Sequence, residues 1–179
     1  MVVVPGTGLP ARHADSVFPR RDRELPVVYF PSCRWRHDIY EEQLNDIDER
    51  AQSDFEERLK AAHILVLEDD MIIGLDLEET ILSFGAPRVT LVADVNEALE
   101  RIAAEPVTIA LLDLSLGGRT NSVPVAEKLF AANVPFAFLT GYSDPPGIPP
   151  ELAAAPILGK PLSTASLLEA IRGLLQGAT

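Results

Sequence analysis

The stretch Val107–Leu112, VTIALL, followed by Asp113, decides the fold of this chain. A short apolar run of this kind, bounded by the turn residues Gly117 and Gly118, is typical of a strand buried on both faces of a sheet. A carboxylate at the end of such a strand is costly to bury unless another group compensates its charge. We therefore expect the compensating groups of Asp113 at the ends of neighbouring strands.

Three further apolar runs share this arrangement, in which a polar side chain follows the last residue of the run. They are Ile64–Leu67 with Glu68 and Asp69, Pro135–Leu139 with Thr140, and Pro156–Gly159 with Lys160. In a parallel α/β sheet, the carboxyl ends of the strands are where binding sites form. The four strand ends would bring two adjacent acids, a third acid, a hydroxyl and an ammonium to one pocket.

Strand and helix patterns alternate from His63 to the end of the chain. Besides the four strands above, the sequence predicts one more strand, Arg88–Val92. It also predicts four helices: Met71–Phe84, Val95–Ala104, Ser122–Ala132 and a final helix from Ser163 or Thr164 to Gly177. Four prolines between Ser143 and Pro150 leave room only for a short helix near Glu151–Ala154. This alternation predicts an α/β fold built on a doubly wound, five-stranded parallel sheet.

The N-terminal third of the chain has a different pattern. Residues 1–36 hold five prolines and read as an irregular tail, with six arginines between Arg12 and Arg36. Residues 37–62 predict an amphipathic helix, because apolar side chains recur at steps of three and four: Ile39, Tyr40, Leu44, Ile47, Ala51, Phe55 and Leu59. We favour packing of this helix on the following domain, residues 63–179, and leave open its pairing with a second copy or a partner.

Composition argues against several classes of protein. The formal net charge of −12 argues against a nucleic-acid partner. Cys33 is the one cysteine, which forbids an intrachain disulfide and suits a reducing cytosol. No apolar run approaches the roughly 20 residues of a membrane span, and the first residues lack the basic flank of a signal peptide. We expect a cytoplasmic protein with no membrane partner.

The grouped acids predict a site for a hard cation. Glu68, Asp69 and Asp113 would repel one another without one, and Mg²⁺ prefers oxygen ligands such as carboxylates. Lys160 would add a compact positive charge, and Thr140 a hydroxyl that can donate to an anionic oxygen. A phosphoryl group carried on Asp113 would then be surrounded by the groups that stabilise charge in phosphoryl transfer, and aspartate is a recognised covalent nucleophile.

On these residues, the segment 63–177 resembles the receiver domain of two-component response regulators. The resemblance is carried by four matching features: Glu68 and Asp69 as the acid pair, Asp113 as the phosphoacceptor, Thr140 as the hydroxyl, and Lys160-Pro161 as the Lys-Pro pair. It implies the strand order 2-1-3-4-5, a need for Mg²⁺, and phosphoryl transfer to Asp113 from a sensor histidine kinase or a phosphotransfer protein. It also implies a chain that is not an enzyme, except that it catalyses its own phosphorylation and dephosphorylation.

Two features depart from the common receiver pattern. Most receivers carry Tyr or Phe three residues before the lysine, where this chain has Ile157. Residues 135–142, PFAFLTGY, instead resemble the receiver subgroup with a Phe-Ala-Thr-Gly signature, in which the fourth helix is reduced; Leu139 replaces the alanine. Phe138, Tyr142 and Ile157 are therefore the candidate switch residues, with Tyr142 either replacing the missing aromatic or serving as a half-buried anchor.

Other functions stay open at this point. A pseudo-receiver would bind partners without taking phosphate, and the missing aromatic at position 157 keeps this alternative. A phosphatase of the haloacid-dehalogenase type also uses an Asp nucleophile with Mg²⁺, Thr and Lys, but it requires a second Asp where this chain has Ser115. A dinucleotide-binding fold is set aside, because no Gly-x-Gly-x-x-Gly follows Leu67.

The expected output of the chain is contact with another protein. No helix-turn-helix pattern precedes residue 63 and no output domain follows the final helix, so we expect a stand-alone receiver. The segment from Gly141 to Pro156 and the final helix are the candidate signalling face. A homodimer through the 37–61 helix or through the 141–177 face is a further prediction.

Overall fold

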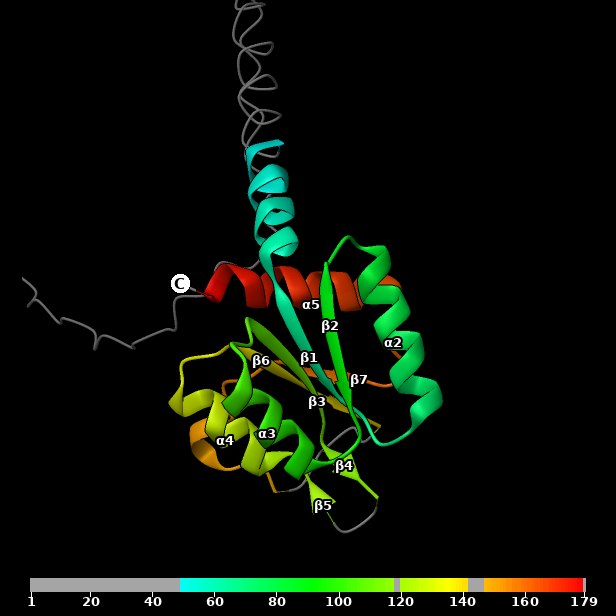
Figure 1. The fold of residues 1–179 in the computed structure, drawn as a ribbon, viewed down its shortest axis with the longest axis vertical. Helices are drawn as coiled ribbons and strands as arrows, with labels where there is room; N and C mark the ends of the chain where they lie inside the picture. The colour runs from blue at the N-terminus through cyan, green and yellow to red at the C-terminus, as the bar shows by residue number, and fades with distance from the viewer. Residues whose placement is uncertain (1–48, 118–119, 142–146, 179) are drawn as a thin grey trace, which may run out of the picture. The chain divides into compact units, whose positions relative to one another are not determined.

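The computed structural model describes residues 49–117, 120–141 and 147–178. Its centre is a five-stranded parallel sheet (Figure 1), with the order β2-β1-β3-β6-β7: Arg88–Val92, His63–Leu67, Ile109–Asp113, Phe136–Thr140 and Ile157–Gly159. Counted along the chain, this is the predicted order 2-1-3-4-5. The predictions for the tail 1–36, for the helix up to residue 48 and for Tyr142 fall outside the described residues.

Helices cover both faces of the sheet and bury its three central strands, β1, β3 and β6, on two sides. Helices α2 (Met71–Ser83) and α5 (Thr164–Gly177) cover one face, and α3 (Val95–Ala104), α4 (Val123–Ala131) and the 3₁₀ turn η1 (Pro150–Leu152) cover the other (Figure 1). Alternate residues of each central strand enter the two cores, so that Ile109 and Leu111 face α2 and α5 while Ala110 and Leu112 face α3 and α4. This arrangement explains the unbroken apolar run at Val107–Leu112.

Local signals set the helix ends. Asp70 caps α2 and accepts hydrogen bonds from the backbone N–H groups of Ile72 and Ile73, at 2.9 and 3.3 Å. Asp94 caps α3 in the same way. Gly85 follows α2 with φ +100°, a left-handed conformation that glycine adopts without steric cost.

The structure differs from the sequence-based expectation in three details. A small antiparallel hairpin, β4 (Ser115–Leu116) and β5 (Thr120–Asn121), follows Asp113 where only a turn was expected. The short helix expected near Glu151–Ala154 is the single turn η1, consistent with the prolines around it. Asp113 and Thr140 form the last residues of their strands rather than following them.

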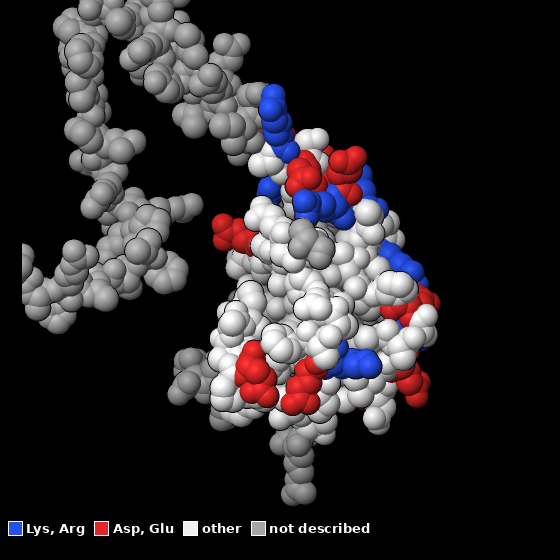
Figure 2. Space-filling view, turned by 90° about the vertical axis from the view of Figure 1, so that its left-hand side faces the viewer, with Lys and Arg blue, Asp and Glu red and all other residues white. Residues whose placement is uncertain are grey.

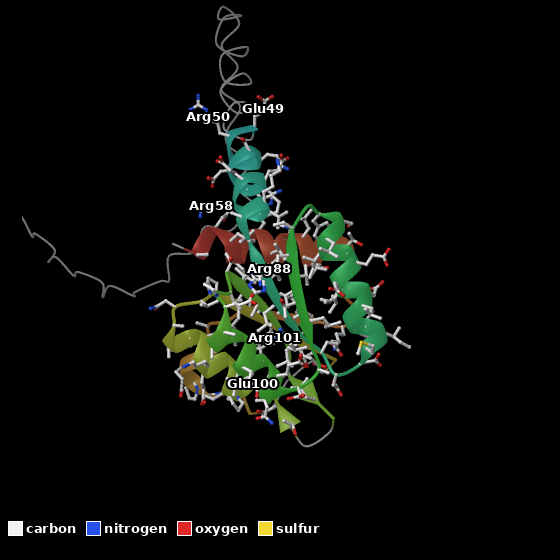
Figure 3. All side chains as sticks on the ribbon, viewed as in Figure 1. Glu49, Arg50, Arg58, Arg88, Glu100 and Arg101 are labelled. Carbon is white, nitrogen blue, oxygen red and sulfur yellow. The ribbon has the colours of Figure 1, made fainter. Side chains whose placement is uncertain are left out.

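Residues 49–61 form a helix, drawn in cyan in Figure 1, that packs on α5. Phe55 and Leu59 are buried in the core on the α5 side, with 6 % and 2 % of their surface exposed. The guanidinium of Arg172 on α5 lies 4.1 Å from the centre of the Phe55 ring. Arg58, labelled in Figure 3, donates a hydrogen bond of 3.1 Å to a carbonyl in the last turn of α5. The described part of this helix therefore packs on its own domain.

Candidate functional site

Strand register brings the predicted polar residues to one edge of the sheet. Leu67 pairs with Leu112, so Glu68 and Asp113 follow at neighbouring positions. Asp113 pairs with Leu139, and Thr140 pairs with Gly159, immediately before Lys160. The backbone N–H of Lys160 donates to the carbonyl of Thr140 at 2.7 Å, which continues this pairing past the end of the sheet.

The three acids form one cluster of oxygen ligands. One carboxylate oxygen each from Glu68, Asp69 and Asp113 lies within 4.8 Å of the others. Glu68 and Asp113 are buried, with 2 % and 6 % of their surface exposed, whereas Asp69 faces solvent. Asp70, the next acid in the chain, instead caps α2. An all-oxygen set that is partly open to water fits Mg²⁺, which binds through one or two carboxylates and keeps several waters.

Lys160 supplies the positive charge of the pocket. Its ammonium donates to Glu68 Oε2 at 2.5 Å and lies 3.0 Å from Asp113 Oδ2, while 18 % of its side chain is exposed. One ammonium facing three carboxylates leaves an excess of negative charge. The donor chemistry and the charge therefore both favour a second cation in this cluster.

Burial and pairing shift two ionisations in the pocket. Burial raises the pKa of Glu68 above its ordinary value, and the charge of Asp113 adds to this, although the hydrogen bond from Lys160 opposes it. Burial alone would lower the pKa of Lys160, but its hydrogen bonds to Glu68 and Asp113 outweigh that effect and raise it. Lys160 thus stays charged, and it does not fully compensate the buried acids.

The β4–β5 hairpin contributes backbone donors that the sequence did not reveal. The N–H of Ser115 donates to Asp113 Oδ1 at 3.3 Å, and the N–H of Gly117 donates to Asp69 Oδ2 at 2.9 Å. The two-glycine turn after Asp113 was the available signal, since Gly117 has φ +59°. Every residue except proline carries a backbone N–H, however, so residue type does not show which N–H groups will face the acids.

The remaining predicted residues differ in their surroundings. Thr140 is buried at the end of β6, with 2 % of its surface exposed. Phe138 is fully buried and packs edge-to-face on Phe136, with ring centres 5.4 Å apart. Ile157 lies on the edge strand β7, opposite Phe138, and is 46 % exposed. The candidate switch residues Phe138 and Ile157 are therefore neighbours, one in the core and one at the surface.

Exposed apolar side chains gather on α2, beside the acid cluster. Ile72 is 81 % exposed and Met71 58 %, and Leu75 also faces solvent. A groove of about 580 Å³ between α2 and the first turn of α5 is lined by Ile72, Pro161 and Lys160, among others. Lys160 thus belongs to both the acid pocket and this groove.

A second apolar groove lies away from the acid cluster. Figure 2 shows the side of the molecule formed by α4, η1 and the end of α5, where a broad uncharged surface separates small groups of charged residues. A groove of about 770 Å³ here is lined by Phe130, Leu152 and Leu174, among others.

Among the described residues, no helix has the length and apolar character to cross a membrane.

Comparisons with known proteins agree on one group of relatives. No family model matches the chain. The solved structure of SdrG from Sphingomonas melonis Fr1 is 34% identical, covers 64% of this chain and 96% of SdrG, and has a TM-score of 0.56; its BeF3-activated conformation matches with a TM-score of 0.55. A CheY-like response regulator receiver domain protein from Methanospirillum hungatei JF-1 is 26% identical, covers 64% of this chain and 94% of its own, and has a TM-score of 0.56.

One curated relative is longer than the matched region. The regulatory protein VirG of Rhizobium rhizogenes is 29% identical over 117 residues, which cover 64% of this chain and 48% of VirG. The match therefore spans about half the length of VirG.

Proposed function

Because the chain belongs to the receiver domain family of response regulators, we propose that Asp113 accepts a phosphoryl group from the phosphohistidine of a sensor histidine kinase or a phosphotransfer protein. The observation that carries this proposal is the cluster of Glu68, Asp69 and Asp113 with the ammonium of Lys160 at its edge. The BeF3-activated conformation of SdrG supports it, because a tetrahedral fluoride complex imitates a phosphoryl group.

In the proposed reaction, a carboxylate oxygen of Asp113 attacks the phosphorus atom of the donor. The new O–P bond forms as the P–N bond to the donor histidine breaks, and the bonding electrons leave with the imidazole. Lys160, 3.0 Å from Asp113 Oδ2, reduces the repulsion between the carboxylate and the incoming phosphoryl oxygens. Mg²⁺, held by Glu68, Asp69 and Asp113, would supply further positive charge to those oxygens when bound.

The phosphoryl group adds up to about two negative charges to the pocket, and this change is the signal. The Thr140 hydroxyl at the end of β6 would donate to a phosphoryl oxygen, and Lys160 would follow the new charge. Thr140 directly precedes the segment from Gly141 to Pro156, and Lys160 follows it after β7; we propose this segment as the two-state element. The helix between β6 and β7 is reduced to the single turn η1, which supports assignment to the Phe-Ala-Thr-Gly subgroup, whose members have a reduced helix at this place. The signal would then leave by protein contact.

The phosphodonor is proposed to dock on the exposed apolar side of α2. Ile72 lines the groove that also contains Lys160, so a protein bound there would reach the acid pocket. The variant Ile72→Asp should slow transfer from an autophosphorylated histidine kinase at least about tenfold, as loss of a central apolar contact does. Labelling by acetyl phosphate should be unchanged. Leu82→Asp, at the far end of α2, is the matched control; equal slowing in both variants would argue against this docking site.

The phosphoacceptor role is tested with acetyl phosphate and intact mass spectrometry. We expect one phosphate adduct that requires Mg²⁺, survives acid, is cleaved by base and is absent in Asp113→Asn. Asp76→Asn, an exposed aspartate on α2, should label like the wild type. An adduct that persists in Asp113→Asn would overturn the proposal. Mg²⁺ binding without any adduct would favour a pseudo-receiver, and turnover of a small phosphate ester would favour a phosphatase.

A further inference from the structure

The β4–β5 hairpin holds two of the three acids of the site through its backbone. The N–H of Ser115 contacts Asp113 Oδ1, and the N–H of Gly117 contacts Asp69 Oδ2 at 2.9 Å. Residues two apart in a strand direct their backbone groups to the same side. Ser115 in β4 and Gly117 in the turn that follows it therefore direct two backbone donors to the acid cluster.

The hairpin is anchored firmly enough to act as a support. Leu114 and Leu116 each have 4 % of their surface exposed and belong to the core on the α3 and α4 side. Buried and exposed residues alternate here, so Ser115 and Gly117 lie at the surface, beside the carboxylates. The backbone of Gly117 is thus tied to the buried core by the side chain immediately before it.

Asp69 is the acid that most requires such a support. Glu68 and Asp113 are buried and contact Lys160, whereas Asp69 faces solvent. Within the described part of the chain, the N–H of Gly117 is the one hydrogen-bond donor to the Asp69 carboxylate. An exposed side chain without that contact would sample several rotamers, and ordering it would weaken the binding of an ion.

We propose that the backbone N–H of Gly117 is a positioning group that holds Asp69 in place for Mg²⁺ and so sets the affinity of the site. This inference rests on the proposed function, in which Asp69 is a ligand of the ion. The hydrogen bond holds the carboxylate in one orientation, and lone pairs of its oxygens would still be available to a metal. Groups that orient a metal ligand in this way commonly change metal affinity 10- to 100-fold when they are removed.

Glycine suits this position because of its backbone conformation. Gly117 has φ +59°, in the left-handed region, and a Cβ atom added there would meet nothing within 4 Å. Side-chain volume is therefore tolerated, while the left-handed conformation favours glycine and, next, asparagine. Gly117→Asn keeps the N–H and the conformation. Gly117→Pro removes the N–H and cannot adopt a positive φ.

The test measures Mg²⁺ binding to the full chain by isothermal titration calorimetry, without a phosphodonor. We expect Gly117→Pro to raise the Kd for Mg²⁺ by about 10- to 100-fold, and Gly117→Asn to restore it to within about threefold of the wild type. Gly117→Val keeps the N–H but opposes the left-handed backbone, so its Kd should lie between these values. If the proline variant does not fold, Gly117→Val provides the comparison with Gly117→Asn.

Gly85→Ala is the matched control. Gly85 also has a positive φ, +100°, and open space around it, but it lies at the end of α2 rather than in the hairpin. The control should lower thermal stability without changing the Kd. A folded Gly117→Pro variant with the wild-type Kd would overturn the inference, as would a Gly117→Asn variant weakened by much more than about threefold, or equal weakening in Gly85→Ala. Wild-type protein that binds no Mg²⁺ would overturn it together with the metal site, whereas Mg²⁺ binding without an adduct would overturn only the phosphoacceptor function.

Discussion

The two ends of the central sheet bury polar side chains in opposite ways. At the amino end, His63 is 7 % exposed, and its Nδ1 donates to the carbonyl of Pro106 while its Nε2 accepts from the hydroxyl of Thr90, both at 2.8 Å. The donor and acceptor roles follow from the carbonyl, which can only accept. Thr108 accepts from the backbone N–H of His63 at 3.0 Å. At this end each polar group of His63 has a partner, and the neighbouring Arg88 forms an ion pair with Glu105.

At the carboxyl end, charge is buried without full compensation. One carboxylate oxygen each of Glu68, Asp69 and Asp113 lies within 4.8 Å of the others, and among the described residues Lys160 is the one cation that contacts Glu68 and Asp113. Burial and the neighbouring acid raise the pKa of Glu68, which means that its charged form is disfavoured there. The amino end thus contributes stability by itself, whereas the carboxyl end loses stability until a cation binds. Such a cost at one end of a well-packed sheet is characteristic of a functional site.

Removal of Lys160 should produce the largest change. Lys160→Met leaves Glu68 and Asp113 buried without a cation, which we expect to lower the free energy of unfolding by about 3 kcal/mol in the absence of Mg²⁺. This value is at the low end for a broken buried pair, because the lysine is partly exposed. Urea unfolding measures it. Lys128→Met, at an exposed position of α4, is the control; similar losses in both variants would show that Lys160 does not compensate the acids.

Mg²⁺ should reverse the deficit at the carboxyl end. At a concentration 100 times its Kd, an ion that binds only the folded state adds about 2.7 kcal/mol to the free energy of unfolding. For a domain of this size that corresponds to a rise in Tm of roughly 10 °C. Differential scanning calorimetry with and without Mg²⁺ measures the shift. Thr90→Val, altered at the amino end, should show the same increment, and a smaller increment there would mean that the two ends are coupled.

The sequence predicted the carboxyl end well because its signals are local. Each functional side chain ends an apolar run, and parallel strands align such ends regardless of how the helices pack. Glu68, Asp113, Thr140 and Lys160 therefore come together as expected. The strand order followed from the resemblance to receivers and is confirmed by the structure.

Other features depend on contacts that residue type does not encode. Strands of two residues, such as β4 and β5, are too short for a periodic pattern. The apolar residues of the helix Met71–Ser83 are not confined to one face, so periodicity could not separate its buried Leu77 and Ile81 from its exposed Ile72. Likewise, Phe138 and Ile157 are both apolar strand residues, and only the position of β7 at the sheet edge exposes one of them.

A smaller effect is expected when the amino end loses one hydrogen bond. Thr90→Val preserves shape but removes the hydroxyl that donates to His63 Nε2, and we expect a loss of about 1 kcal/mol in the free energy of unfolding. Urea unfolding checks this value, with Thr120→Val at an exposed position of β5 as the control. Phosphorylation by acetyl phosphate should not change. No loss of stability would mean that water replaces the hydroxyl at this half-buried position.

The smallest expected effect has the opposite sign and separates the two ends most clearly. Asp69→Asn removes one negative charge but keeps an oxygen that can accept from the N–H of Gly117, so crowding falls while the hairpin contact survives. We expect the metal-free protein to gain about 0.5 kcal/mol, because Asp69 is exposed and solvent screens its repulsion. The increase in the free energy of unfolding that Mg²⁺ gives the wild type should be largely lost in this variant. Asp76→Asn on α2, outside the cluster, should change neither quantity. Destabilisation of the metal-free protein by Asp69→Asn would show that its charge is already compensated, and the contrast between the two ends of the sheet would then be wrong.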